Sequence, residues 1–194
     1  MEWLWLFCFY SFLGYLLERM FAKITASPRQ VRKGLLLLPL CPAYGLAMVA
    51  DLAAADLYAL SGLALFWRGM GIATVVEYLT HLFYDRVLGV SFWDYTGVPG
   101  CLGRGRICLP FSLVWGVLSA GAAVLFQPLL VPLARRMPPV VTYGLLLLLT
   151  ADAITSASVL FHSRDTELLS IRRLRSRLSE NREGPGSVTA RDGH

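Results

Sequence analysis

The sequence predicts an all-α, multi-pass membrane protein with five transmembrane helices, a re-entrant or interfacial loop and a C-terminal amphipathic helix. Of its 194 residues, 56% are hydrophobic and 16% charged, and the mean hydropathy is +0.56. A soluble chain of this size could not bury so much apolar surface. The apolar residues also gather in five segments of about 20 residues, the length that crosses a bilayer as a helix. The basic residues lie beside these segments and in the C-terminal tail, which favours an anionic membrane surface over nucleic acid as their partner.

Residues 1–163 form the predicted transmembrane domain, with spans at about 3–22, 43–65, 70–88, 109–133 and 140–161. A short turn at 67–69 separates the second and third spans. Pro128 and Pro132 loosen the end of the fourth span. Residues 164–180 have an apolar face set among arginines, which fits either a cytoplasmic amphipathic helix on the membrane surface or a solvated tail helix. Residues 181–194 are expected to form a disordered tail.

The segment before the second span is predicted to be non-helical. Pro39 and Pro42 lie three residues apart in an apolar run, and an unbroken helix there would lose backbone hydrogen bonds. We therefore expect residues 35–41 to be non-helical or re-entrant. At membrane depth such backbone is tolerated only where protein covers it.

Acidic residues inside the predicted spans require partners. Asp51 and Asp56 fall in the second span, where two central aspartates cost about 5–7 kcal/mol and its apolar residues offset only part of that. Either Asp56 lies near an interface, or both acids face partners in the bundle. Asp152, in the middle of the last span, is expected to pair with an arginine or a hydroxyl group across the bundle.

The positions of the basic residues predict the orientation of the chain. With the N-terminus outside, most of the 18 Lys and Arg residues fall on the inner side, and the outer side holds only Arg68, Arg135 and Arg136. The positive-inside rule then places the C-terminus in the cytoplasm. The expected location is a bacterial inner membrane.

Residues 92–116, called here the central segment, carry the richest chemistry. The segment lies between two apolar spans, yet it holds closely spaced glycines, aromatic residues and both signs of charge. In the predicted orientation it lies toward the inner leaflet, near the end of the first span and the start of the second. The candidate functional polar cluster consists of Glu18, Tyr44, Glu77, His81, Asp85, Trp93, Asp94, Tyr95, Arg104 and Arg106.

Two interpretations of this cluster remain open. Arg104 and Arg106 are natural partners for Glu18, Asp85 or Asp94, and such pairs can simply lock a re-entrant loop onto the helices. Glu77, His81 and Asp85, spaced four residues apart, form one polar stripe on a helix. The stripe fits a proton relay or cation path, or a set of polar groups satisfied by neighbouring helices.

Motifs for enzymatic chemistry are absent from the sequence. It contains no GxxxxGK[ST] or GxGxxG phosphate-binding loop, no GxSxG elbow and no HExxH. None of the four cysteines forms a CxxC pair, and Glu77 with His81 supplies fewer ligands than a catalytic zinc needs. We therefore expect no catalytic residue, no metal and no cofactor.

Four blocks of sequence together resemble the CmpB-like type IV ABC-transporter permease family, which consists of small bacterial multi-pass proteins. They cover most of the region 13–116, with Lys33, Leu38 and the stretch 102–104 departing from the usual family residues. The blocks are Leu13-Gly14-Tyr15 with Glu18; Lys33-Gly34-Leu35-Leu36 with Pro39, Pro42, Tyr44 and Gly45; Glu77-Tyr78; and Trp93-Asp94-Tyr95 with Gly105-Arg106-Ile107-Cys108-Leu109 and Trp115-Gly116.

The resemblance implies a permease-like subunit of a transport system. Because the chain lacks a nucleotide-binding motif, it would need a separate cytoplasmic ATPase. Five helices enclose little space, so a homodimer or hetero-oligomer is expected for any pathway. The alternative is a membrane scaffold or assembly factor that uses the central segment as a packing element or partner epitope. A membrane-embedded enzyme is a third, weaker interpretation.

Overall fold

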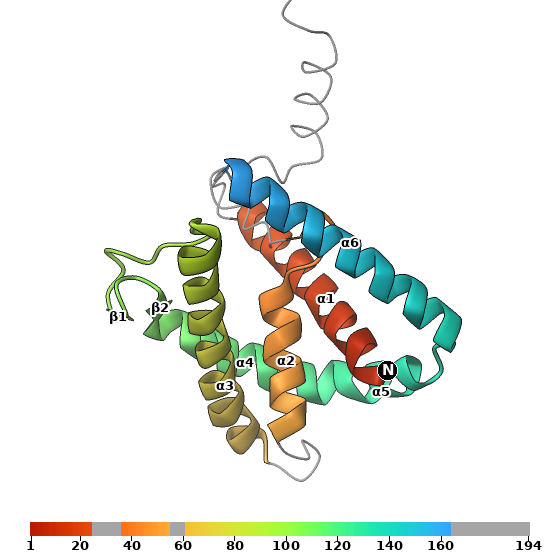
Figure 1. Cartoon of the computed structure of the whole chain (residues 1–194). Helices are drawn as coiled ribbons and strands as arrows, with labels where there is room; N and C mark the ends of the chain where they lie inside the picture. Colours follow the sequence, from red (N-terminus) through yellow and green to blue (C-terminus); the bar gives the residue numbers. More distant parts are fainter. Residues whose placement is uncertain (25–35, 55–60, 164–194) are drawn as a thin grey trace, which may run out of the picture.

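The computed structural model describes residues 1–24, 36–54 and 61–163, and within them the chain is helical apart from one small hairpin and the segments that connect the elements. The predicted amphipathic helix and tail, the basic loop after the first helix, and Asp56 lie outside the described residues. Figure 1 shows the arrangement. The elements are α1 (Glu2–Ile24), α2 (Pro42–Ala54), α3 (Gly62–Phe83), the π-helical turn η2 (Tyr84–Leu88), β1 (Cys101–Leu102), β2 (Ile107–Cys108), α4 (Leu109–Gly121), the π-helical turn η3 (Ala122–Phe126), α5 (Gln127–Arg135) and α6 (Pro139–Ser163).

Three of the described helices are long and apolar enough to cross a membrane. They are α1, the continuous helix Leu109–Arg135 formed by α4, η3 and α5, and α6. The helix α2 is apolar but shorter. The all-α membrane class is therefore confirmed, and the number of five spans stays a prediction.

The start of α3 differs from the expectation of a turn at 67–69. Ser61 caps the helix by accepting a hydrogen bond from the Ala64 amide at 3.3 Å, and residues 67–69 lie inside the helix. Gly69 is needed for close packing: a Cβ there would lie 2.3 Å from the Ser119 Cβ of α4. The glycine therefore marks a helix–helix contact, and the predicted turn was wrong.

Glycine also determines how the other helices pack. A Cβ on Gly14 of α1 would lie 2.3 Å from the ring of Tyr44 in α2, and a Cβ on Gly45 would collide with Ser11. A Cβ on Gly116 of α4 would lie 2.7 Å from the ring of Phe66 in α3. Small residues at these positions let the pairs α1–α2 and α3–α4 approach closely, as they do in membrane helix bundles.

Residues 36–41 are non-helical, as predicted, and α2 begins at Pro42. Leu36 packs between Cys8 of α1 and Leu149 of α6. The carboxylate of Asp152 accepts hydrogen bonds from the amides of Leu37 and Leu38, both at 3.1 Å. Protein thus covers and satisfies this backbone, which is what irregular structure at membrane depth requires.

These contacts correct the partner predicted for Asp152. Across the bundle the carboxylate binds backbone amides rather than an arginine, and its one described hydroxyl partner, Ser156, lies one turn further along α6. Two closely spaced amides present a pair of donors that suits the two oxygens of a carboxylate.

Asp51 has the buried partner that its position requires. It is 1% exposed, and its Oδ1 atom lies 2.9 Å from Nε of Arg68 in α3. The same guanidinium donates to the Asp51 carbonyl at 3.0 Å, so α2 and α3 are joined by a charge pair and a backbone contact. For Asp51, the prediction that an acid in this span faces a partner inside the bundle is therefore confirmed.

Candidate functional site

The chain from Gly89 to Cys108, called here the docked loop, follows the π-helical turn at the end of α3 and returns as the hairpin β1–β2. Cys101 lies opposite Cys108 in the antiparallel register. Gly103, Arg104 and Gly105 have φ values of 63°, 61° and 78°, so three consecutive residues adopt the left-handed conformation. A side chain on Gly105 would also collide with Asp94 and Thr96. The tight turn thus depends on glycine at this position.

Glu77 ties three elements together. Its side chain is buried in α3, with only 2% of the residue exposed. One carboxylate oxygen accepts a hydrogen bond from the Tyr95 hydroxyl of the docked loop at 2.9 Å. The other oxygen accepts from Nε1 of Trp115 in α4 at 3.1 Å. Each oxygen of this buried carboxyl group therefore has a hydrogen-bond donor from another element, as buried polar atoms require.

His81 lies one turn further along the same face of α3. It is 7% exposed, and its ring meets that of Trp93 at 5.2 Å between centroids with an interplanar angle of 74°. Trp93 in turn donates from Nε1 to the carbonyl of Arg106 at 3.2 Å. Among the described residues, His81 Nδ1 has no hydrogen-bond partner.

Asp85 completes the stripe in the π-helical turn η2, directly after α3. Its Oδ2 atom lies 2.7 Å from the Arg106 guanidinium, and both side chains are partly exposed. The hydrogen bond and the charge of Asp85 raise the pKa of Arg106. Each residue of the predicted stripe therefore contacts the docked loop: Glu77 through Tyr95, His81 through Trp93, and Asp85 through Arg106.

Asp94 plays a local part in the docked loop. Its carboxylate accepts hydrogen bonds from the Thr96 hydroxyl at 2.5 Å and the Thr96 amide at 2.8 Å. Both bonds lower the pKa of Asp94 below its ordinary 3.8, and the bond from the hydroxyl has the larger effect. An aspartate that binds the amide two residues ahead forms an Asx turn.

The two arginines of the predicted cluster differ in their surroundings. Arg106 has Asp85 as its partner, while Arg104 is exposed at the tip of the turn.

Glu18 and Tyr44 extend the cluster to α1 and α2. The Tyr44 hydroxyl donates to Oε1 of Glu18 at 2.9 Å, and the Tyr44 ring lies 4.5 Å from that of Trp115. Since Trp115 donates to Glu77, a continuous chain of contacts runs from α1 through α2 and α4 to α3 and the docked loop. The structure thus brings together eight of the ten predicted residues, in two groups around Glu77 and Asp85, while Asp94 bonds Thr96 within the loop and Arg104 stands outside these contacts.

Trp115 is the residue of this site that the sequence interpretation did not include in the cluster. The sequence indicated its role only indirectly, because an indole N–H in an apolar helix needs a hydrogen-bond acceptor when it is buried. Trp115 is 9% exposed and finds that acceptor 38 residues earlier in the chain. Among the described residues, no group of three His, Cys, Asp or Glu side chains lies close enough to hold a metal ion.

Comparison with known proteins places the chain in a family. No curated protein and no solved structure matches it. A family model described as "Putative ABC-transporter type IV" matches residues 5–157, which include every element from α1 to most of α6 and the whole candidate site. The protein is a member of this type IV ABC-transporter family and, with its long apolar helices, a transport-related membrane protein.

Proposed function

We propose that the protein is a permease-like subunit of a transport system in a bacterial inner membrane, and that it works with a separate cytoplasmic ATPase. The family membership and the apolar helices support this function. The sequence contains neither a GxxxxGK[ST] nor a GxGxxG phosphate-binding loop, so ATP hydrolysis would take place on another chain. A pathway through so few helices also requires a second membrane subunit, either a copy of this chain or a different one.

The observation that carries the proposal is the attachment of the docked loop to α3 at three successive points. These contacts hold the loop in one position against a long helix, so a force applied to the loop is transmitted to α3. In the orientation that the basic residues predict, this loop lies on the cytoplasmic side. It is therefore the place at which we expect an ATPase to engage.

The outer surface of the docked loop suits such a partner. Leu102 is 66% exposed at the hairpin, Val98 is 39% exposed, and Arg104 is exposed between the strands. Exposed apolar residues beside an arginine are a composition that protein interfaces favour. The contacts to α3 come from the inner face of the loop, so the outer face is available.

Affinity purification from native membranes tests the function. We expect the wild-type protein to recover an ATPase in a stoichiometric amount. Arg104→Glu is expected to reduce that recovery roughly tenfold, because it reverses a charge at the proposed contact. The matched control is Arg136→Glu, an exposed arginine in the turn after α5, which should recover as much ATPase as the wild type. Recovery of a non-transport membrane partner in place of an ATPase contradicts the proposal.

A scaffold or assembly factor is the second candidate function. It is favoured by the way both oxygens of Glu77 accept hydrogen bonds from aromatic side chains of other elements. A polar network satisfied in this way rigidifies a structure and suits a loop that serves as a fixed binding surface. The same purification separates the two functions through the identity of the recovered partner.

A further inference from the structure

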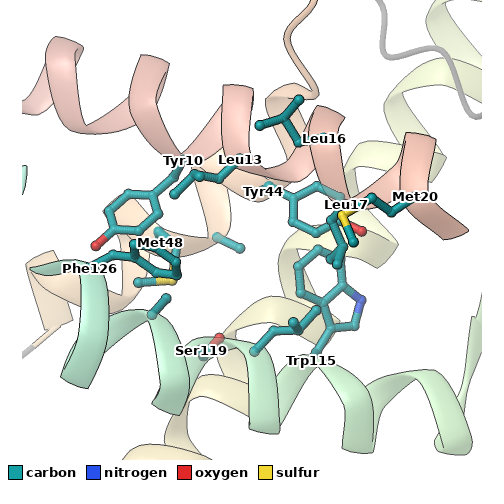
Figure 2. A pocket seen from close by; sticks show the side chains of 13 residues that line it. Tyr10, Leu13, Leu16, Leu17, Met20, Tyr44, Met48, Trp115, Ser119 and Phe126 are labelled. Carbon is teal, nitrogen blue, oxygen red and sulfur yellow. The ribbon is translucent and has the colours of Figure 1, made fainter.

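A cleft of about 300 Å³ lies between α1 and α4, with α2 behind it. Figure 2 shows Leu16 and Met20 reaching in from α1, Trp115 from α4, and Tyr44 and Met48 from α2. Its volume is at the lower end of the roughly 300–1,000 Å³ typical of ligand sites. Leu16 and Met20, at its rim, are 40% and 60% exposed. The cleft is thus partly open along one side.

The cleft presents hydrocarbon because its polar atoms are engaged elsewhere. The Tyr10 hydroxyl donates to Gln127, that of Tyr44 to Glu18, and the Trp115 indole to Glu77. None of these three acceptors lines the cleft. An occupant would therefore meet mainly methyl groups, methylenes and ring faces, with Ser119, 3% exposed, as the one other polar side chain among the lining residues.

The surroundings of the cleft indicate what fills it. Both α1 and the helix Leu109–Arg135 are long and apolar enough to span a membrane, so we expect the open side to face the bilayer interior. Water is disfavoured in an apolar cleft, whereas lipid tails are present there. The lining residues of α1 run from Tyr10 to Met20, about 15 Å along a helix. This is the depth of one leaflet, half of the bilayer's hydrocarbon thickness of about 30 Å.

Among the described residues of α1, the exposed basic side chains lie at one end of the cleft. Arg19 and Lys23 are exposed on α1 beside Met20, the last residue of α1 that lines the cleft. At the other end Tyr10 is hydrogen-bonded to Gln127 and packs with Met48 and Leu130, which closes the cleft with an apolar cluster. A molecule with one apolar tail and an anionic head matches this distribution.

We propose that the cleft binds one acyl chain of an anionic phospholipid, whose phosphate is held by Arg19 and Lys23. The tail lies between α1 and α4 with its end toward Tyr10, and the headgroup lies at the membrane surface beyond Met20. In the predicted orientation this is the cytoplasmic leaflet, in which anionic lipids attract basic residues. The proposal does not rest on the transport function, although Tyr44 and Trp115 both line the cleft and belong to the contacts that support the docked loop.

The test uses full-length protein reconstituted into vesicles of phosphatidylcholine and phosphatidylglycerol in equal amounts, extracted again in mild detergent and examined by native mass spectrometry. The wild type is expected to retain one phosphatidylglycerol per chain. Ala122→Phe places a ring in the cleft and is expected to retain roughly tenfold less, as overpacking a site by one side chain implies. Val124→Phe adds the same ring on an exposed position of the same π-helical turn and should retain lipid like the wild type.

The headgroup is tested by the double variant Arg19→Gln with Lys23→Gln. It is expected to retain lipid without preferring phosphatidylglycerol over phosphatidylcholine. The proposal is overturned if the wild type retains no lipid, or if Ala122→Phe and the wild type retain equal amounts. It is also overturned if Ala122→Phe dissociates a dimer and leaves lipid retention unchanged, because a second copy of the chain then fills the cleft. If the double variant still prefers phosphatidylglycerol over phosphatidylcholine, Arg19 and Lys23 do not hold the lipid phosphate.

Discussion

Glu77 shows how one buried carboxylate can fix the positions of three elements. Tyr95 approaches it from the docked loop and Trp115 from α4, and each donates to a different oxygen. A carboxylate is the side chain that can accept both bonds at once without presenting a donor of its own. In a site that is 2% exposed, replacing either partner leaves a buried polar atom unsatisfied, which is costly.

The variant Glu77→Gln tests this role. The amide keeps the size of the side chain but turns an NH₂ group toward one of the two donors. We expect a loss of about 1–3 kcal/mol in unfolding free energy, measured as a lower melting temperature of the purified protein in detergent. Glu2→Gln is the matched control, since the ion pair of Glu2 with Arg135 is exposed and worth about 0–1 kcal/mol. Equal shifts in the two variants would contradict the account.

Asp94 makes the stability of the docked loop depend on pH. Its pKa is lowered in the folded loop by the hydrogen bonds from Thr96, so its contribution to stability is present above the ordinary value of 3.8. The contribution is lost as the pH falls through the lowered value. Asp94→Asn should therefore increase hydrogen exchange in residues 92–100 relative to the wild type at neutral pH, after correction for the intrinsic exchange rate.

The same comparison below the lowered pKa supplies the check on Asp94. Once the wild-type carboxyl group is protonated, the wild type and Asp94→Asn are expected to exchange at similar rates. A difference that persists unchanged at low pH would mean that the negative charge of Asp94 does not hold the turn.

At the scale of the elements, close contacts through glycine determine which helices meet. Gly14 and Gly45 bring α1 and α2 together, and Gly69 and Gly116 do the same for α3 and α4. In lipid, helix association depends on packing and on hydrogen bonds, because the lipid tails are as apolar as the side chains. The close approach of α1 and α2 also brings Tyr44 within hydrogen-bonding distance of Glu18.

Gly14→Ala is expected to destabilise the α1–α2 contact. Its Cβ would lie 2.3 Å from Cγ of Tyr44, so the ring or the helix must move, at a cost of about 1–3 kcal/mol. Gly71→Ala in α3 is the control, because its Cβ would meet nothing within 4 Å and alanine favours a helix over glycine by roughly 0.5–1 kcal/mol. The melting temperatures of both variants are compared with that of the wild type. A Gly14→Ala variant as stable as the wild type would show that α1 and α2 pack more loosely than the structure indicates.

These elements also show what the sequence could and could not predict. The helical membrane class and the non-helical residues 36–41 follow from hydropathy and from two prolines, which act locally. The turn predicted at 67–69 was wrong because the role of Gly69 depends on Ser119, fifty residues away in the sequence. Likewise, charge predicted an acidic partner for Arg106 but left Glu18, Asp85 and Asp94 as alternatives. The choice of Asp85, like that of Trp115 as a donor to Glu77, depends on how the elements pack.

At the scale of the whole molecule, two residues take part both in the polar contacts and in the lining of the apolar cleft. Tyr44 and Trp115 line the cleft with their rings while their polar atoms bind Glu18 and Glu77. The chain of contacts from α1 to the docked loop therefore borders the proposed lipid site. A change in the separation of α1 and α4 would alter both the cleft and the support of the loop.

We propose that the docked loop, held on the stripe of α3, couples this subunit to an ATPase. Charge exchange between Asp85 and Arg106 tests it most directly, with the recovered ATPase quantified for Asp85→Arg, Arg106→Asp and the double variant, and folding checked by size-exclusion chromatography. Each single variant is expected to lose most of the ATPase, and the double variant, which restores the 2.7 Å pair with its charges reversed, is expected to recover it. Full recovery in both folded single variants would contradict it.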